Sequence, residues 1–429
     1  MLALVHLMTP VPAARALTPP PIDRAQLPAA GSPAPPAATE QNGGCVTAGT
    51  TTSAAATQLS ALHLSAVWPL TRGAGQVVAV IDTGVTRHRL LPHLLPGGDF
   101  VSSGDGTQDC DGHGTAVAGI IAGAPSGEFS GVAPDSTILS IRQSSNRFRY
   151  TSDPGAPGVG DVDTLARAVR SAADSGATVI NISSVACEPA AAPPDDRALG
   201  AALAYAVDVR NVVVVSAAGN VGGSCTKQNP LGDAAHPGVP DWETTESVVS
   251  PAWYDDYVLT VGSVGPSGAA SPFSLAGPWV DVAAPGENVV SLVTDGDGLT
   301  DSRSDGPDRK PLSGTSYAAP VVSAVVALIR SRAPQLTARQ VMARIKDTAR
   351  HPAGGWNPQV GHGVIDVFAA VSSDAAVTPV PAAPRHPIAA SHSPDAGAAL
   401  PSRVALIGAA ACIGAVLLAG GICTLREHR

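Results

Sequence analysis

Val77-Val78-Ala79-Val80-Ile81-Asp82-Thr83-Gly84-Val85 is the stretch of sequence that decides the fold. It begins with an uninterrupted apolar run, which is typical of a parallel strand buried on both faces. Asp82 follows this run directly. In open α/β sheets, groups that bind and react gather at the carboxyl ends of strands. The stretch therefore predicts a buried strand and a functional aspartate at its end.

Similar apolar runs recur along the chain and alternate with helical stretches. We expect further strands at 137–141, 178–182, 212–216 and 257–264, and helices at 164–175, 198–209 and 337–348. Gly176 suits the end of the first helix, and Thr337 with Gln340 forms a capping-box pattern at the start of the last one. This alternation predicts an α/β fold, a parallel sheet with helices on both faces.

Two more motifs supply the partners that a functional aspartate needs. Asp111-Gly112-His113-Gly114-Thr115 and Ser313-Gly314-Thr315-Ser316 each open a helical run. A serine hydroxyl is a poor nucleophile until a base removes its proton. His113 would be that base for Ser316, and Asp82 would fix the imidazole tautomer. The set predicts a catalytic triad of Asp82, His113 and Ser316.

A fourth motif provides a hydrogen-bond donor. Val214-Val215-Ser216-Ala217-Ala218-Gly219-Asn220 places Asn220 at the end of another expected strand. Its side-chain amide can donate a hydrogen bond to the oxyanion of a tetrahedral intermediate. We therefore expect Asn220 to form the oxyanion hole.

Two other readings of these residues compete with the triad. Ile81-Asp82-Thr83-Gly84 also fits an aspartic protease, but its best second aspartate, in Asp174-Ser175-Gly176, closes a helix instead of following a strand. Asp109, Asp111 and His113 could together bind a metal ion. The triad gives His113 a stronger role, so no metal or cofactor is expected.

The four motifs resemble those of the subtilase (peptidase S8) family in type and order. The match is D-T-G at Asp82, H-G-T at His113, A-A-G-N at Asn220 and G-T-S-x-A-x-P at Ser316, within residues 59–372. The resemblance implies a subtilisin-like serine endopeptidase of peptides or proteins. Tyr317 departs from it, because most subtilases have Met at that position. The resemblance also implies that Ser183, Ser184 and Val185 bind substrate by adding it as a strand.

The chain is more specifically similar to the mycosins, membrane-anchored subtilases of type VII secretion systems. The matching stretches are Ser140-Ile141-Arg142-Gln143-Ser144-Ser145, Val179-Ile180-Asn181-Ile182-Ser183 and Ala283-Ala284-Pro285-Gly286. This resemblance implies a secretion membrane complex as partner. It also implies a complex-stabilising role beside proteolysis.

The flanks of the domain predict export and a membrane anchor. Residues 1–16 end in an A-x-A pattern typical of a signal peptide, and residues 17–58 and 373–402 are a Pro/Ala-rich arm and linker. Residues 403–425 are almost uncharged, and a helix of that length spans about 33 Å, enough to cross a bilayer. Two arginines in the tail 426–429 favour a cytoplasmic C-terminus and an extracytoplasmic protease domain.

Charge and cysteine usage agree with an exported protease. The formal net charge is −9 without a long basic run, so nucleic acid is not an expected partner. Cys412 and Cys423 lie in the apolar C-terminal stretch, and the other four cysteines lack zinc-site spacing, which indicates two disulfides. Those four are Cys45, Cys110, Cys187 and Cys225.

The expected topology selects one of the three possible pairings of these cysteines. Cys187 and Cys225 each follow one of the strands 178–182 and 212–216, which a crossover helix should make neighbours. We therefore predict Cys187–Cys225, which leaves Cys45–Cys110. The arm has almost no bulky apolar residues for a core of its own, so we expect it to stay attached and wrap the catalytic domain.

Overall fold

The computed structural model describes residues 17–47, 49, 51, 58–155, 158–232, 236–305 and 308–373. The predicted signal peptide at 1–16, the linker beyond 373 and the predicted membrane span at 403–425 lie outside this part of the chain. Within it, no helix combines the length and apolar character needed to cross a membrane.

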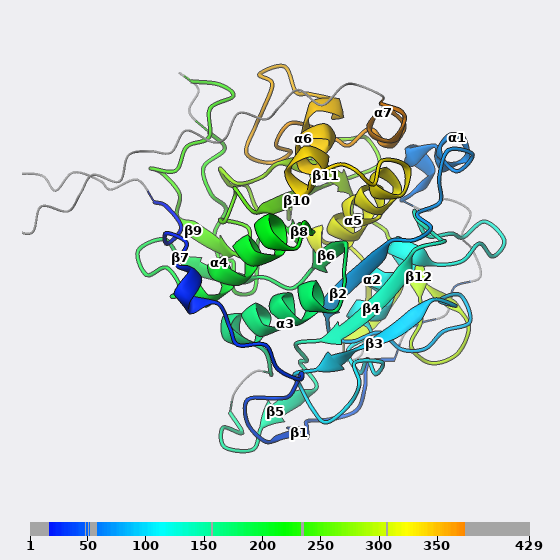
Figure 1. Cartoon of the computed structure of the whole chain (residues 1–429), viewed down its shortest axis with the longest axis vertical. Coiled ribbons are helices and arrows are strands. Elements are labelled where there is room, and N and C mark those ends of the chain that lie inside the picture. Colours follow the sequence, from blue (N-terminus) through cyan, green and yellow to red (C-terminus); the bar gives the residue numbers. More distant parts are fainter. Residues whose placement is uncertain are drawn as a thin grey trace, which may run out of the picture. The chain divides into compact units, whose positions relative to one another are not determined.

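Seven parallel strands form one sheet in the order β11-β10-β8-β6-β2-β4-β3 (Figure 1). Their bounds are β2 (Val77–Asp82), β3 (Leu94–Asp99), β4 (Thr137–Arg142), β6 (Val179–Ile182), β8 (Val213–Ala217), β10 (Val258–Val264) and β11 (Val282–Pro285). The chain adds β3 and β4 on one side of β2, then crosses to add β6 and the later strands on the other side. Ligands bind at such a reversal of strand order, so the carboxyl ends of β2 and β6 are the expected site.

Helices cover both faces of this sheet, as the sequence predicted. They are α1 (Leu64–Val67), α2 (His113–Ala122), α3 (Val162–Asp174), α4 (Arg197–Ala204), α5 (Thr315–Arg332), α6 (Ala338–Thr348) and α7 (Val367–Ser372). α2 and α5 pack against each other, and α5 crosses β6, β8, β10 and β11. α3 packs against β2, β4 and β6, with α4 beside it.

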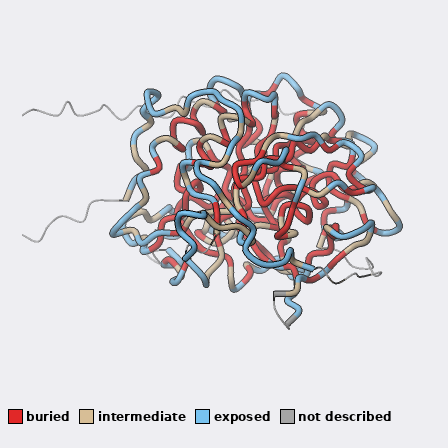
Figure 2. Tube along the Cα trace, turned by 90° about the horizontal axis from the view of Figure 1, so that it is seen from below, coloured by how far each residue is buried: buried red, intermediate tan, exposed pale blue. Residues whose placement is uncertain are grey.

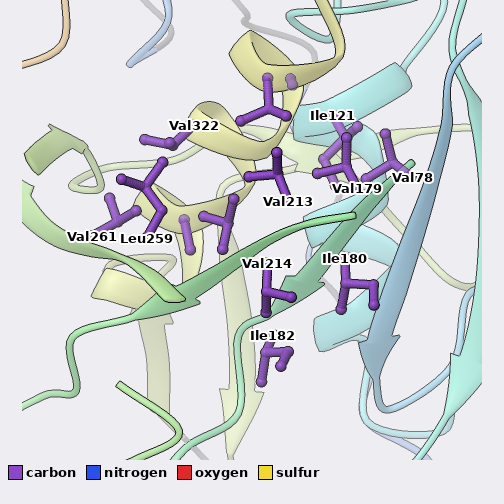
Figure 3. Close-up of a cluster of buried hydrophobic side chains, with 14 of the residues drawn as sticks. Val78, Ile121, Val179, Ile180, Ile182, Val213, Val214, Leu259, Val261 and Val322 are labelled. Carbon is purple, nitrogen blue, oxygen red and sulfur yellow. The ribbon is translucent and has the colours of Figure 1, made fainter. Parts of the chain in front are cut away.

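Period-two alternation along the strands builds a separate core on each face. Val78, Val179 and Val213 are aligned in one register row, and Figure 3 shows them on the same side as Ile121 of α2. The next residues along the strands, such as Ile180, point to the other side (Figure 3). Burial is concentrated in the interior that these layers enclose, as Figure 2 shows.

Shorter elements lie outside the main sheet. They are η1 (Arg24–Gln26), β1 (Thr39–Gln41), η2 (Ser60–Leu62), β5 (Phe148–Tyr150), β7 (Ala186–Pro189), the π-helical turn η3 (Tyr205–Val209), β9 (Ser247–Ser250), β12 (Ser291–Leu292), β13 (Leu299–Thr300), β14 (Ser302–Asp305) and β15 (Asp308–Pro311). The predicted helix 198–209 is therefore α4 followed by η3, whereas the capping box of Thr337 and Gln340 is confirmed at α6.

The described part of the N-terminal arm lies along the domain. Its β1 pairs antiparallel with β5, and Arg149 forms an ion pair with Glu40 at 2.8 Å. Pro33 packs so closely on β3 that a methyl group at Gly98 would lie 2.2 Å from it. The Cys45–Cys110 disulfide fixes the end of this segment near α2. The arm is thus held by a strand pair, an ion pair and a covalent bond.

Candidate active site

The end of β2 and the start of α2 bring an aspartate and a histidine together. Asp82 is fully buried, and its Oδ1 lies 2.7 Å from Nδ1 of His113. The same oxygen accepts a hydrogen bond from the backbone N–H of Thr83 at 2.7 Å. The contact with Asp82 favours the imidazole tautomer that carries its proton on Nδ1. Nε2 is then free to accept a proton. Burial lowers the pKa of His113, but the charge and hydrogen bond of Asp82 outweigh burial and raise it.

The glycines of the D-G-H-G-T motif allow this approach. A methyl group at Gly114 would lie 2.1 Å from the carbonyl oxygen of Gly84, so only glycine lets α2 come this close to β2. Gly112 has φ of 75°, a left-handed conformation that favours glycine. The hydroxyl of Thr83 accepts from the backbone N–H of Gly114 at 3.0 Å. Both glycines thus serve to place the imidazole.

The two aspartates before His113 have structural partners. Both carboxylate oxygens of Asp109 accept hydrogen bonds. The bond from the Thr115 hydroxyl is 2.7 Å long, and the bond from the Thr83 hydroxyl is 2.8 Å long. Burial raises the pKa of Asp109 to about 6 despite these donors. Asp111 accepts from the Ser145 hydroxyl at 2.5 Å and therefore holds the loop after β4. No cluster of metal-ligating side chains occurs among the residues that the structure describes, which leaves the metal-site reading without support.

The aspartic-protease reading is not supported either. Asp174 ends α3, where it accepts from Nε of Arg170 at 2.5 Å and from the hydroxyl of Tyr205 at 2.7 Å. It is exposed at this helix end, whereas Asp82 is buried beside His113. The two carboxylates therefore do not share the environment that a catalytic dyad requires.

The start of α5 places Ser316 and fixes the orientation of Asn220. The Asn220 Oδ1 accepts from the backbone N–H of Thr315 at 2.9 Å and from its hydroxyl at 3.2 Å. This use of the oxygen leaves the amide nitrogen available as a donor. A methyl group at Gly314 would lie 3.1 Å from Ser316 Oγ and 3.5 Å from Asn220 Nδ2. The glycine therefore keeps open a space that both groups border.

A buried amide ties the serine helix to the neighbouring strand. Asn181 is fully buried at the end of β6, and its Oδ1 accepts from the hydroxyl of Ser323 on α5 at 2.8 Å. Its Nδ2 donates to the hydroxyl of Ser183 at 2.8 Å. Ser183 in turn donates to the backbone carbonyl of Ser316 at 2.9 Å. One residue thus fixes both the serine and the predicted substrate-binding segment.

A cleft of about 990 Å³ is lined by the predicted catalytic, oxyanion-hole and substrate-binding residues except Asp82, which lies buried behind His113. Ser183, Ser184 and Val185 form part of its wall, with Asn220 and Ser316. The cleft also borders the arm at Val46 and the hairpin β14–β15. The structure therefore brings the sequence-predicted residues to one place.

The second disulfide lies at the cleft, next to the predicted substrate-binding segment. Cys187 on β7 is bonded to Cys225, so both predicted pairings are present in the structure. Strands β6 and β8 are neighbours, as that prediction assumed. Cys225 lines the cleft, and its sulfur would lie 3.5 Å from a methyl group at Gly219. The bond therefore joins the segment after β6 to the loop after β8.

Tyr317 packs behind the imidazole. Its ring centroid lies 5.2 Å from that of His113, and the side chain is buried. An aromatic ring at this position restrains the histidine through contact. Sequence reasoning identified Tyr317 only as a departure from a family pattern.

Comparison with known proteins agrees with this geometry. Residues 73–363 match Peptidase S8, the subtilase family. The chain belongs to the subtilase family. This subtilase is 60% identical over 375 residues to mycosin-4 of Mycobacterium tuberculosis, a match that covers 85% of this chain and 80% of that relative. It is a serine protease of the mycosin group, as the sequence predicted.

Solved structures give the same result for this subtilase. The MycP3 protease from the type VII (ESX-3) secretion system matches with a TM-score of 0.78 and 46% identity, over 83% of this chain and 100% of that one. A chain of an intact ESX-5 inner membrane complex matches with a TM-score of 0.79 and 40% identity, over 95% of this chain and 98% of that one.

Proposed function

We propose that this subtilase hydrolyses peptide bonds through an acyl-enzyme, with Asp82, His113 and Ser316 as its catalytic triad. The observation that carries the proposal is the 2.7 Å contact of buried Asp82 with His113, which lines the same cleft as Ser316. The bonds from Thr315 that fix the oxygen of Asn220 support an oxyanion role for its amide nitrogen. Family membership supports the same assignment.

In this proposal the groups act in sequence. Nε2 of His113 takes the hydroxyl proton of Ser316 while the Oγ of Ser316 attacks the substrate carbonyl carbon. Asp82 stabilises the imidazolium that forms, because its carboxylate is buried against the ring. The new oxyanion accepts hydrogen bonds from the Asn220 amide and from the backbone N–H of Ser316 in the first turn of α5. His113 next gives its proton to the leaving amine, and water releases the acyl group.

Ser316→Ala tests the assignment directly. The change removes a hydroxyl from a helix start, so the fold should persist while peptide hydrolysis and fluorophosphonate labelling disappear. Ser331→Ala is the matched control, because it removes a hydroxyl at the far end of the same helix, where it donates to the carbonyl of Ala74, and leaves the nucleophile. Hydrolysis by Ser316→Ala at the wild-type rate would show that another residue is the nucleophile.

We further propose that the chain is anchored by residues 403–425 and works within a type VII secretion membrane complex. The similarity to a chain of the intact ESX-5 inner membrane complex extends over 95% of this chain, further than a match to the protease domain alone would. The protease domain at 59–372 would lie outside the cytoplasmic membrane, with 426–429 in the cytoplasm. Protease shaving of envelope-stripped cells should digest the domain, and its full protection would contradict this orientation.

A complex-stabilising role beside proteolysis has its own test. The same similarity over 95% of the chain to a component of an assembled complex favours it. Secretion and complex assembly should survive in a Ser316→Ala strain but fail in a strain that lacks the chain. Equal assembly in both strains would limit the function to cleavage.

A further inference from the structure

The hairpin β14–β15 presents two cations to the cleft. Arg303 on β14 lies directly opposite Lys310 on β15. Residues paired across antiparallel strands point to the same face, and both of these side chains line the cleft. Like charges in such a pair repel and destabilise the hairpin. This arrangement brings no evident benefit to the fold, which is typical of a residue pair kept for function.

Neither cation is neutralised within the described part of the chain. No ion pair or side-chain hydrogen bond from Arg303 or Lys310 occurs there, and both are exposed. Asp111 and Asp161 border the same cleft and carry negative charge, but neither forms an ion pair with the hairpin: Asp111 accepts from Ser145, and Asp161 accepts from the backbone N–H of Thr164. Along this rim of the cleft, Arg303 and Lys310 therefore present two unpaired positive charges, although the whole chain has a formal net charge of −9.

The position of this rim identifies the half of the substrate that it faces. Ser183 and Val185 border the acyl half, if substrate adds there as a strand. The leaving amine takes its proton from His113 and so departs on the histidine side. Arg303 lines a small recess together with His113 and Tyr317, and its charge lowers the pKa of the imidazole. The cations therefore lie on the leaving-group side of the bond.

From this placement we infer that Arg303 and Lys310 select substrates with an acidic side chain among the first three residues after the cleaved bond. The inference rests on the proposed function, because the triad defines where that bond lies. A carboxylate there would approach two uncompensated cations, whereas a lysine would be repelled. The two residues determine specificity without taking part in the chemical steps.

Matched peptides test the inference on the full-length protein. Starting from a peptide that the protein cleaves, each of the three positions is made Glu, Gln or Lys, with an amidated C-terminus. At about 50 mM salt, Glu should exceed Gln in kcat/KM by about threefold to tenfold at one position at least, with Lys below Gln. At about 1 M salt the preference should shrink. A Gln peptide with a free C-terminal carboxylate tests whether a chain end can replace the side chain.

Variants of the hairpin assign the preference to its cations. Arg303→Gln with Lys310→Gln should bring the Glu-to-Gln ratio to about 1, and Arg303→Glu with Lys310→Glu should make Lys the preferred residue. Arg197→Gln, at an exposed ion pair at the start of α4, is the control for loss of a positive charge and should keep the ratio. Fluorophosphonate labelling, which needs no leaving peptide, shows for each variant that the site is folded.

The outcomes separate the inference from the function on which it depends. Equal kcat/KM for Glu, Gln and Lys peptides at all three positions would overturn the inference and leave the triad standing. A Glu-to-Gln ratio that stays unchanged in Arg303→Glu with Lys310→Glu would overturn the inference as well. Loss of that ratio in Arg197→Gln would also overturn it. Failure of the wild-type protein to cleave any peptide or to react with fluorophosphonate would instead refute the proposed function.

Discussion

Replacing Asn220 separates its two hydrogen-bonding roles, because one end of the amide faces the cleft and the other holds a helix. Asn220→Ala removes the donor to the oxyanion, and loss of one such donor costs about 10²–10³ in kcat. It also removes the acceptor of the Thr315 backbone N–H, which lies 2.9 Å from Oδ1. A buried donor left without a partner costs about 1–3 kcal/mol in the free energy of unfolding.

Asn220→Asp is the matched variant. It keeps an oxygen for Thr315 but offers a negative charge to the oxyanion, so kcat should fall at least as far as in Asn220→Ala. Its free energy of unfolding should stay closer to wild type. The KM should change little in either variant, because the amide contacts charge that develops only in the transition state.

Peptide hydrolysis and thermal unfolding measure the two effects separately. We expect both variants to lose kcat, and Asn220→Ala to lose about 2–4 °C in Tm for each kcal/mol of lost stability. A kcat for Asn220→Ala within tenfold of wild type would refute the oxyanion role. Equal losses of Tm in Ala and Asp would refute the anchoring role of Oδ1.

Three further predictions follow from contacts in the site. Because Asp82 raises the pKa of His113 and a base must be unprotonated, kcat/KM should rise with pH through a midpoint above the ordinary value of about 6.5; in Asp82→Asn any residual activity should show a lower midpoint. Cys45→Ser with Cys110→Ser opens a loop of 65 residues and should destabilise the protein by about 4 kcal/mol on the chain-entropy model, and an unchanged Tm would contradict this. Gly314→Ala should fold normally, since its φ of 162° suits any residue, but lose kcat as its methyl group fills the oxyanion space; full activity would place the oxyanion elsewhere.

The sequence predicted the parts of this molecule that depend on local pattern. The apolar runs that became β2, β6 and β8 are buried on both faces, so their composition identifies them without knowledge of neighbours. Gly114, beside His113, marks a close approach to Gly84 that any other residue would block. The order of the expected strands, helices and motifs along the chain was sufficient to predict the sheet, the disulfides and the residues of the proposed triad.

The sequence did not predict contacts between residues far apart in the chain. Thr315 holds the oxygen of Asn220 across 95 positions, and Ser323 reaches Asn181 across 142. Short exposed strands such as β14 and β15 have no apolar period to reveal them, so the pair of Arg303 and Lys310 was missed. These features depend on tertiary packing, which local sequence patterns do not contain.

The hydrogen bonds of Asn181 have a consequence for how this enzyme can change over evolutionary time. A single amide holds both the helix that carries Ser316 and the Ser183 segment of the cleft wall. Mutations that change the cleft wall through this amide therefore also displace Ser316, the proposed nucleophile. New substrate preferences are thus more accessible through the outlying loops, where a change leaves the reaction rate intact.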